Sequence, residues 1–169
     1  MYIVLTKPKT FFVNKTQSID FTCIHTNADQ FLNKRAEFKR LVEIHNPSII
    51  GITEVKPKNY RYEIQDCELS LEGYEVFHNM RKEGRGLVLY VKEELKASMV
   101  EELASDAMES IFVDCHLQDN KTLRVGLMYR SPNSSTENNK AFNDLLSKAS
   151  DQKNFHLLVM GDFNYKEID

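Results

Sequence analysis

Two polar side chains stand at a spacing that suits phosphate chemistry, directly after an apolar run near the end of the chain. Residues 155–160 (FHLLVM) predict a buried strand, and Gly-Asp-Phe-Asn follows at once. Side chains two positions apart in extended chain point to the same side, so Asp162 and Asn164 can face one metal-bound phosphate together. Gly, Asp and Asn also favour β-turns, and taken alone the segment is explained equally well as a turn.

Three more polar residues lie at the ends of predicted strands. Asn27 and Glu54 each follow a strand, and Tyr129 ends another. Taken singly, Asn27 is the start of a loop, Glu54 the first solvated residue after a buried strand, and Tyr129 a phenol at the core edge. Open sheets collect ligand-binding groups at strand ends, so we expect these side chains to converge. Carboxylates and neutral hydrogen-bonding groups, without a His or Cys pair at ligand spacing, suit Mg²⁺.

Composition and charge narrow the class of protein. The chain has 169 residues, enough for one domain with a sizeable core. Its net charge of −3 supplies no global field for nucleic acid, so DNA binding would depend on local basic patches. The three cysteines are scattered without a CxxC pair, which is typical of reduced thiols. Reduced thiols indicate a reducing compartment, so we expect an intracellular protein, nuclear or cytoplasmic. No apolar run approaches the roughly 20 residues that span a bilayer, so we expect no membrane partner.

The pattern of predicted elements indicates an α/β fold. Apolar and β-branched runs predict strands at 19–25, 48–53, 74–79, 86–92, 97–102, 110–117, 122–129 and 155–160. Apolar residues at helical spacing predict helices at 31–45 and 138–149. The run SIIGIT (48–53) is almost wholly apolar, which indicates burial on both faces of the strand. Strands outnumber helices and the helices fall between strands, so two packed sheets with helices outside fit best.

The first 18 residues predict no regular element. Their apolar pieces, YIVL and FFV, are interrupted by Lys7, Lys9 and Lys15. A signal peptide would need a longer apolar stretch and a small-residue cleavage site. We therefore expect residues 1–18 to be a poorly ordered lead-in and residues 19–169 to form the domain.

Five segments resemble one known family in sequence and in order. They are HTNAD (25–29), GITEVK (51–56), GRGLVLYVK (84–92), LMYRSPNSS (127–135) and LLVMGDFN (157–164). They follow the pattern of the endonuclease/exonuclease/phosphatase superfamily over about residues 20–169. The runs YRSPNSS and GDFNYKEID are most similar to the apurinic-type endonuclease domain of non-LTR (LINE-like) retrotransposons. The resemblance implies a DNase I-like fold, in which two sheets form a sandwich flanked by helices.

The resemblance also implies a role for each of the polar residues. Glu54 would be the principal Mg²⁺ ligand, with Mn²⁺ as an alternative ion, and Asn27 would stand beside it in the hydrogen-bonded shell of the metal. Asp162 would orient or deprotonate the attacking water, Asn164 would hold a phosphate oxygen, and Tyr129 would donate to the phosphate or support the nucleophile. The product would be a DNA nick with a free 3′-OH, which primes reverse transcription. A reverse transcriptase domain would follow in the parent element.

The chain departs from the family pattern at its end. Family members continue past GDFN to further strands and a terminal Asp-His pair, whereas this sequence stops at Asp169. We therefore expect a sandwich that is incomplete at the C-terminus and a chain that nicks DNA poorly or not at all. The histidines, His25 among them, fall at non-matching positions and are expected to be solvated or core residues. Two alternatives stay open: a non-catalytic remnant of the same fold, and a small-substrate phosphatase of the same superfamily.

Basic residues near the motifs are candidates for contacts with the DNA backbone. They are Lys56, Lys58, Arg61, Arg85 and Arg130. These loops would rim the same cleft, where basic side chains position a nucleic acid through its phosphates. Charge runs in loops are also commonly just solvated. Lys34 and its basic neighbours are better explained as the outer face of an amphipathic helix.

Overall fold

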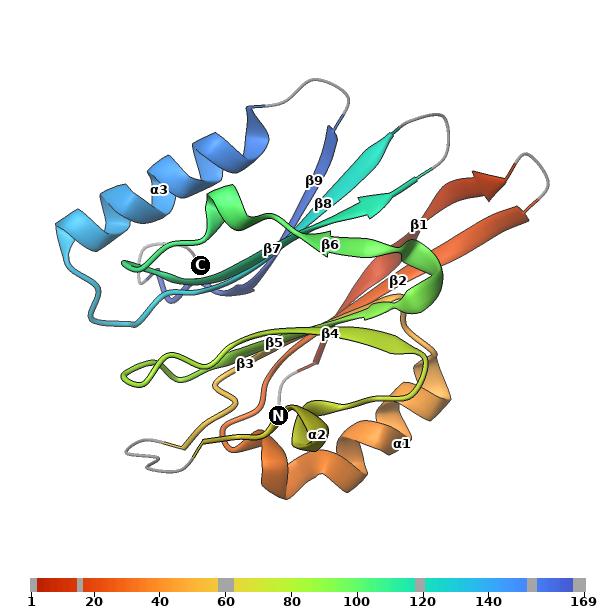
Figure 1. The fold of residues 1–169 in the computed structure, drawn as a ribbon, viewed down its shortest axis with the longest axis horizontal. Helices are drawn as coiled ribbons and strands as arrows, with labels where there is room; N and C mark the ends of the chain where they lie inside the picture. The colour runs from red at the N-terminus through yellow and green to blue at the C-terminus, as the bar shows by residue number, and fades with distance from the viewer. Residues whose placement is uncertain (1–2, 15–16, 58–62, 118–120, 152–154, 166–169) are drawn as a thin grey trace.

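The computed structural model describes residues 3–14, 17–57, 63–117, 121–151 and 155–165, which form two β-sheets packed face to face (Figure 1). The first sheet has the order β1 (Ile3–Asn14), β2 (Gln17–Asn27), β3 (Ile49–Thr53), β5 (Leu87–Lys92), β4 (Tyr74–Asn79). The second has the order β6 (Ala97–Met99), β7 (Glu109–His116), β8 (Thr122–Tyr129), β9 (Phe155–Asp162). The α/β sandwich predicted from the sequence is therefore confirmed.

Three α-helices cover the outer faces of the sandwich. Helices α1 (Arg35–His45) and α2 (Asp66–Leu69) lie on the first sheet, and α3 (Thr136–Ser150) lies on the second (Figure 1). Short 3-10 turns at Phe31–Lys34, Glu93–Leu95 and Glu101–Leu103 join these elements. In the part of the chain that the structure describes, no helix is long and apolar enough to cross a membrane.

Alternation along the strands builds separate cores on the two faces of each sheet. In β5, Leu87, Leu89 and Val91 join the core between the sheets, whereas Val88 and Tyr90 join the core beneath α1. This is the period-two alternation expected of extended chain. Every residue of β3 is buried, as the apolar run SIIGIT predicted. The rigid central strands can therefore hold polar groups at their ends in fixed positions.

Strand directions determine which ends meet. Strands β2 and β3 are parallel, as are β8 and β9, and both pairs bring their C-terminal ends together. Strand β5 runs antiparallel to β3, and β7 runs antiparallel to β8, so the N-terminal ends of β5 and β7 lie at the same edges. Six strand ends from two sheets therefore surround one end of the sandwich.

Two elements lie where the sequence predicted none. Strand β1 pairs antiparallel with β2 over most of the segment expected to be a poorly ordered lead-in. That pairing depends on the partner strand, which local sequence pattern does not report. Helix α2 has only four residues, too few to show a period, and it starts with a reciprocal cap between Gln65 and Glu68. The strand predicted at 97–102 ends at Met99 and gives way to a 3-10 turn.

Gly161 has a conformation that its place in the motif requires. Its φ is 146°, in the region that favours glycine, and a Cβ there would lie 1.8 Å from the backbone oxygen of Met128. Since Met128 and Gly161 are register partners in β8 and β9, the missing side chain lets the two strands pair closely just before Tyr129 and Asp162. Gly161 therefore allows the close strand pairing that places Tyr129 beside Asp162.

The thiols offer a test of the packing. Cys23 and Cys115 are buried and Cys67 is exposed, and none of the three is disulfide-bonded. Burial raises the pKa of both Cys23 and Cys115 to about 12, which suppresses their reactive thiolate forms. We expect Ellman's reagent to titrate one thiol in the native protein and three after denaturation. Rapid reaction of three thiols without denaturant would contradict the packing of the core between the sheets.

Candidate active site

A cavity of about 1190 Å³ lies where the strand ends of the two sheets meet. Asn27 and Glu54 reach it from the first sheet, and Tyr129 and Asp162 reach it from the second. Tyr129 and Asp162 are register partners, and Asn27 is the register partner of Thr53, the residue before Glu54. The structure thus brings together four of the five residues singled out from the sequence.

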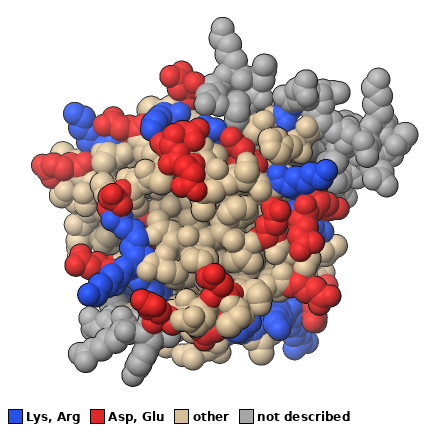
Figure 2. All heavy atoms as spheres, viewed as in Figure 1, with Lys and Arg blue, Asp and Glu red and all other residues tan. Residues whose placement is uncertain are grey.

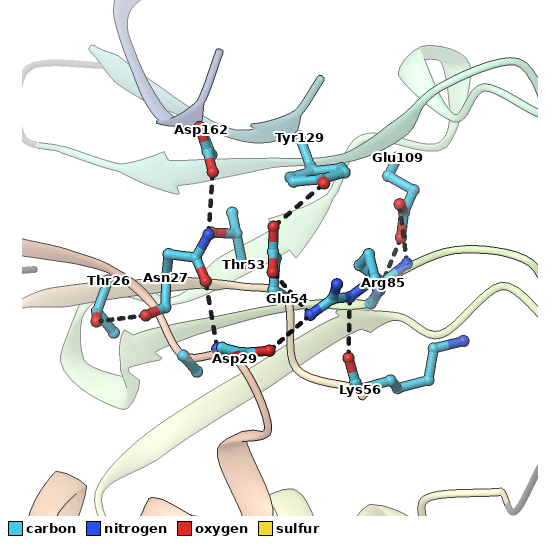
Figure 3. A network of polar contacts seen from close by, with 12 residues as sticks. Thr26, Asn27, Asp29, Thr53, Glu54, Lys56, Arg85, Glu109, Tyr129 and Asp162 are labelled. Atoms are coloured by element: carbon cyan, nitrogen blue, oxygen red, sulfur yellow. Dashed lines mark hydrogen bonds and ion pairs between the residues drawn. The ribbon is translucent and has the colours of Figure 1, made fainter. Parts of the chain in front are cut away.

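Direct hydrogen bonds cross between the sheets inside this cavity (Figure 3). The side-chain nitrogen of Asn27 donates to Asp162 Oδ2 at 3.0 Å, and the Tyr129 hydroxyl donates to Glu54 Oε1 at 3.2 Å. The other end of the Asn27 amide accepts from the backbone nitrogen of Asp29 at 3.2 Å. These two hydrogen bonds restrict the rotation of the Asn27 amide. Its nitrogen is directed at Asp162, and its oxygen is directed at the backbone of Asp29.

The backbone at Glu54 is held in an unfavourable conformation. Its φ is 55°, and the neighbouring cavity residues Asp29 and Gln30 have φ of 37° and 79°. Left-handed backbone at residues other than glycine is costly and tends to persist where the surrounding structure enforces it, often at functional sites. Here the turn after β3 aims the Glu54 carboxylate into the cavity.

Tyr129 is a hydrogen-bond donor at neutral pH. Burial raises its pKa to about 12, and the negative charge and hydrogen bond of Glu54 act in the same direction, while Arg85 opposes them. The phenol therefore stays protonated and keeps its bond to Glu54. It can also donate to an anionic ligand in the cavity.

His25 lines the same cavity, although the sequence predicted a solvated or core histidine. Its Nε2 lies 3.4 Å from the Thr53 hydroxyl. Burial lowers the pKa of His25, and the charge of Asp162 works against that effect. The imidazole is mainly neutral at neutral pH and stands near the carboxylate of Asp162.

Asn164 has a different position from the one expected. Its side-chain nitrogen donates to the backbone oxygen of Arg130 at 2.9 Å, and it does not join the described lining of the cavity. Its φ of 45° turns the chain away after β9. The amide nitrogen is thus used to tie the end of β9 to the loop after β8.

The predicted DNA contacts divide into three groups. Lys56 and Arg130 are buried: the Lys56 ammonium donates to the backbone oxygen of Arg81, and Arg130 donates to Asn139 and to the backbone of Asn164. Arg85 points into the cavity and forms an ion pair with Glu54. Lys58 and Arg61 lie outside the described residues. For Lys56, Arg85 and Arg130, the charge was evident from the sequence, but the neighbours that engage each side chain were not.

Charge around the cavity has mixed sign. Among the described residues, the lining carboxylates are those of Asp29, Glu54, Glu83, Glu109 and Asp162, and the lining basic side chains are Lys34 and Arg85. The Lys34 ammonium donates to the backbone oxygens of Ala28 and Asp29, so Lys34 belongs to the cavity rim and not to a solvated helix face. Figure 2 shows acidic and basic side chains interspersed on the face that it presents, with no extended basic patch there. Within the described part of the lining, carboxylates outnumber basic side chains, which favours a bound cation.

The donor atoms fit a hard divalent cation that keeps most of its water. Glu54, Asn27 and Asp162 offer only oxygen ligands, as Mg²⁺ prefers. Among the described residues, no three His, Cys, Asp or Glu side chains gather closely enough to hold a metal by themselves. A site with one or two protein ligands and several waters is typical of Mg²⁺ and unlike a closed zinc site.

A sequence model of the endonuclease/exonuclease/phosphatase family matches residues 17–168. The chain belongs to this family. The match covers nearly the same residues as the resemblance noted in the sequence, so that part of the sequence interpretation is confirmed. By its name, the family comprises endonucleases, exonucleases and phosphatases. A search of curated proteins found no significant match.

Solved structures show the same fold at low sequence identity. TDP2 of D. rerio, complexed with a single-stranded DNA product, has a TM-score of 0.63 and 13% identity, and the endonuclease domain of TRAS1, a telomere-specific non-LTR retrotransposon, has 0.63 and 15%. Both matches cover 87% of this chain and 62% of the other chain. The AP endonuclease LMAP from Leishmania major has a TM-score of 0.54 and 14% identity, covering 76% and 47%. The chain thus spans less than two thirds of each of these structures.

Proposed function

We propose that this protein is a Mg²⁺-dependent phosphodiesterase that nicks DNA and leaves a 3′-OH end. The observation that carries the proposal is the convergence of Asn27, Glu54, Tyr129 and Asp162 from two sheets on one cavity, joined in pairs by hydrogen bonds. Glu54 holds the cation, with Mn²⁺ as an alternative, and Asn27 stands close by. When bound, the cation supplies a Lewis acid that polarises the phosphoryl oxygen and stabilises the leaving 3′ oxygen.

The side chains of the cavity transfer the proton and stabilise the developing charge. Asp162 accepts the proton of the attacking water, and the Asn27 amide keeps its carboxylate in one orientation. Tyr129, which is protonated at neutral pH, donates to Glu54 and stands ready to donate to a phosphate oxygen as negative charge develops there. These groups are set by strand ends, so little reorganisation is needed when substrate binds.

DNA as substrate is supported by the folds that the chain resembles. TDP2 was solved with a DNA product, and the TRAS1 domain is an endonuclease of a non-LTR retrotransposon. With the runs YRSPNSS and GDFNYKEID, this supports an origin in a LINE-like element. In that element a reverse transcriptase would use the 3′-OH as primer, and the chain would act inside the cell, where it meets DNA.

The test is nicking of supercoiled plasmid. We expect open-circular product with Mg²⁺ and none with EDTA, and we expect a DNA polymerase to extend the nick without further treatment. Release of phosphate from small esters without nicking would instead identify a phosphatase of the same family. Absence of both activities in a folded protein would identify a non-catalytic member.

Binding of the cation has a readout that needs no turnover. Mg²⁺ at about ten times its Kd should stabilise the fold by about 1.4 kcal/mol, which raises the melting temperature of a protein this size by about 3–6 °C. Glu54→Gln keeps the shape of the side chain but removes its charge, so it should abolish this shift. Differential scanning fluorimetry measures both proteins with and without Mg²⁺. An unchanged shift in the variant would place the ligand elsewhere.

A further inference from the structure

Arg85 occupies a position in the cavity that the proposed mechanism does not use. Its Nη2 lies 2.7 Å from Glu54 Oε2 and 3.0 Å from Asp29 Oδ1, and its Nε donates to the backbone oxygen of Lys56 at 3.1 Å (Figure 3). Only 15% of its side chain is exposed. The guanidinium is therefore fixed by three neighbours, one of them the carboxylate proposed to hold the cation.

The backbone that carries Arg85 is anchored by the opposite sheet. Glu109, the first residue of β7, accepts hydrogen bonds from the backbone nitrogens of Arg85 at 3.1 Å and Gly86 at 2.8 Å. The loop approaches this carboxylate so closely that a Cβ at Gly84 would lie 2.3 Å from Glu109 Oε1. Glu109 thus fixes the loop from which the Arg85 side chain extends.

The two oxygens of Glu54 are consequently engaged from opposite sides. Tyr129 donates a hydrogen bond to Oε1, and the Arg85 guanidinium forms an ion pair with Oε2. A hydrogen bond from the phenol and an ion pair with the guanidinium restrict the Glu54 side chain and offset part of its negative charge. Arg85 therefore has two opposing effects on a cation at Glu54: it orients the ligand, and it repels the cation.

We propose that Arg85 is a positioning residue that orients Glu54 for catalysis while competing with the divalent cation for it, and that Glu109 holds Arg85 in place. This inference rests on the proposed function. It predicts that loss of Arg85 changes metal affinity and reaction rate in opposite directions. General damage to the fold would lower metal affinity and reaction rate together. A higher affinity with a lower rate would therefore identify Arg85 as a positioning residue.

The experiment compares Arg85→Gln with the unaltered chain. Isothermal titration calorimetry with Mn²⁺ should show a Kd that falls about threefold to fivefold, the size of one partly exposed charge pair. The nicking rate at saturating metal should fall about tenfold or more because Glu54 loses its fixed orientation. Arg85→Lys keeps the charge but lacks the planar fork, so it should restore the Kd and recover the rate only in part. Lys82→Gln, an exposed neighbour on the same loop, should match the unaltered chain in both values.

Hydrogen exchange at the backbone amides tests the role of Glu109 separately. Glu109→Gln puts an amide against two backbone donors, so hydrogen exchange at the amides of Arg85 and Gly86 should accelerate. Glu83→Gln removes a carboxylate from the same cavity wall and should leave exchange at those two amides unchanged. Unchanged exchange in Glu109→Gln would overturn the anchoring role.

The outcomes separate this inference from the function on which it rests. Mn²⁺ affinity and rate that fall together in Arg85→Gln, or an affinity that stays constant, would overturn the role of Arg85, provided that Glu54→Gln still abolishes binding. Mn²⁺ binding that survives in Glu54→Gln would overturn the proposed metal ligand itself.

Discussion

Asp162→Asn should lower the rate of Mg²⁺-dependent plasmid nicking by about 10²–10⁴-fold, the usual contribution of a general base. The asparagine has the size of aspartate and can still accept the hydrogen bond that Asn27 now gives to Asp162 Oδ2 at 3.0 Å. It cannot take a proton from water. The change should therefore remove the chemistry while keeping the geometry, and it should show in single-turnover nicking at saturating metal.

A matched control separates this loss from general damage. Asp144→Asn makes the same substitution at an exposed position on α3 that is not among the described residues lining the cavity. It should nick at the rate of the unaltered protein, and both variants should melt within a few degrees of it. Equal nicking by Asp162→Asn and the unaltered chain would show that another group activates the water.

Regular strands could be predicted well because their own residues carry the pattern. Tyr74–Asn79 and Thr122–Tyr129 were predicted with the bounds that the structure has, because each strand carries apolar side chains on both faces of its sheet. Strand β1 could not be predicted in this way, because its conformation depends on pairing with β2. Helix α2 depends on one capping interaction, which has no periodic signal.

The residues of the cavity that stand at strand ends could be predicted from the sequence. Asn27, Glu54, Tyr129 and Asp162 each stand at or directly after a strand, and parallel pairing brings such ends together. The loops were not predictable by the same reasoning. Arg85 and Lys56 are both basic residues near the cavity, yet one bonds to Glu54 and the other is turned toward Arg81. The positions of the loops depend on contacts between the two sheets, such as the hydrogen bond from the backbone of Arg85 to Glu109. The sequence pattern does not report such contacts.

Asp114→Ala should lower the free energy of unfolding by about 3–5 kcal/mol, the usual cost of removing one partner of a buried ion pair. Arg124 is 2% exposed, and its Nε and Nη2 donate to the two oxygens of Asp114, each at 2.8 Å. The two residues are cross-strand partners on β7 and β8, and Arg124 also donates to the Ala149 oxygen near the end of α3. Urea unfolding followed by circular dichroism measures the loss. A change below about 1 kcal/mol, as found for exposed pairs, would contradict burial of this ion pair.

Removing both charges should cost much less than removing one. In Asp114→Ala the guanidinium stays beneath α3 without the carboxylate that offsets its desolvation. In the double variant Asp114→Ala/Arg124→Met an apolar side chain of similar length fills that space, and replacement of buried ion pairs by apolar groups is often neutral or stabilising. We therefore expect the double variant to be more stable than Asp114→Ala alone. The pair would then fix the register of β7 and β8 under α3 more than it adds net stability, and through β8 it would help to hold Tyr129 at the cavity.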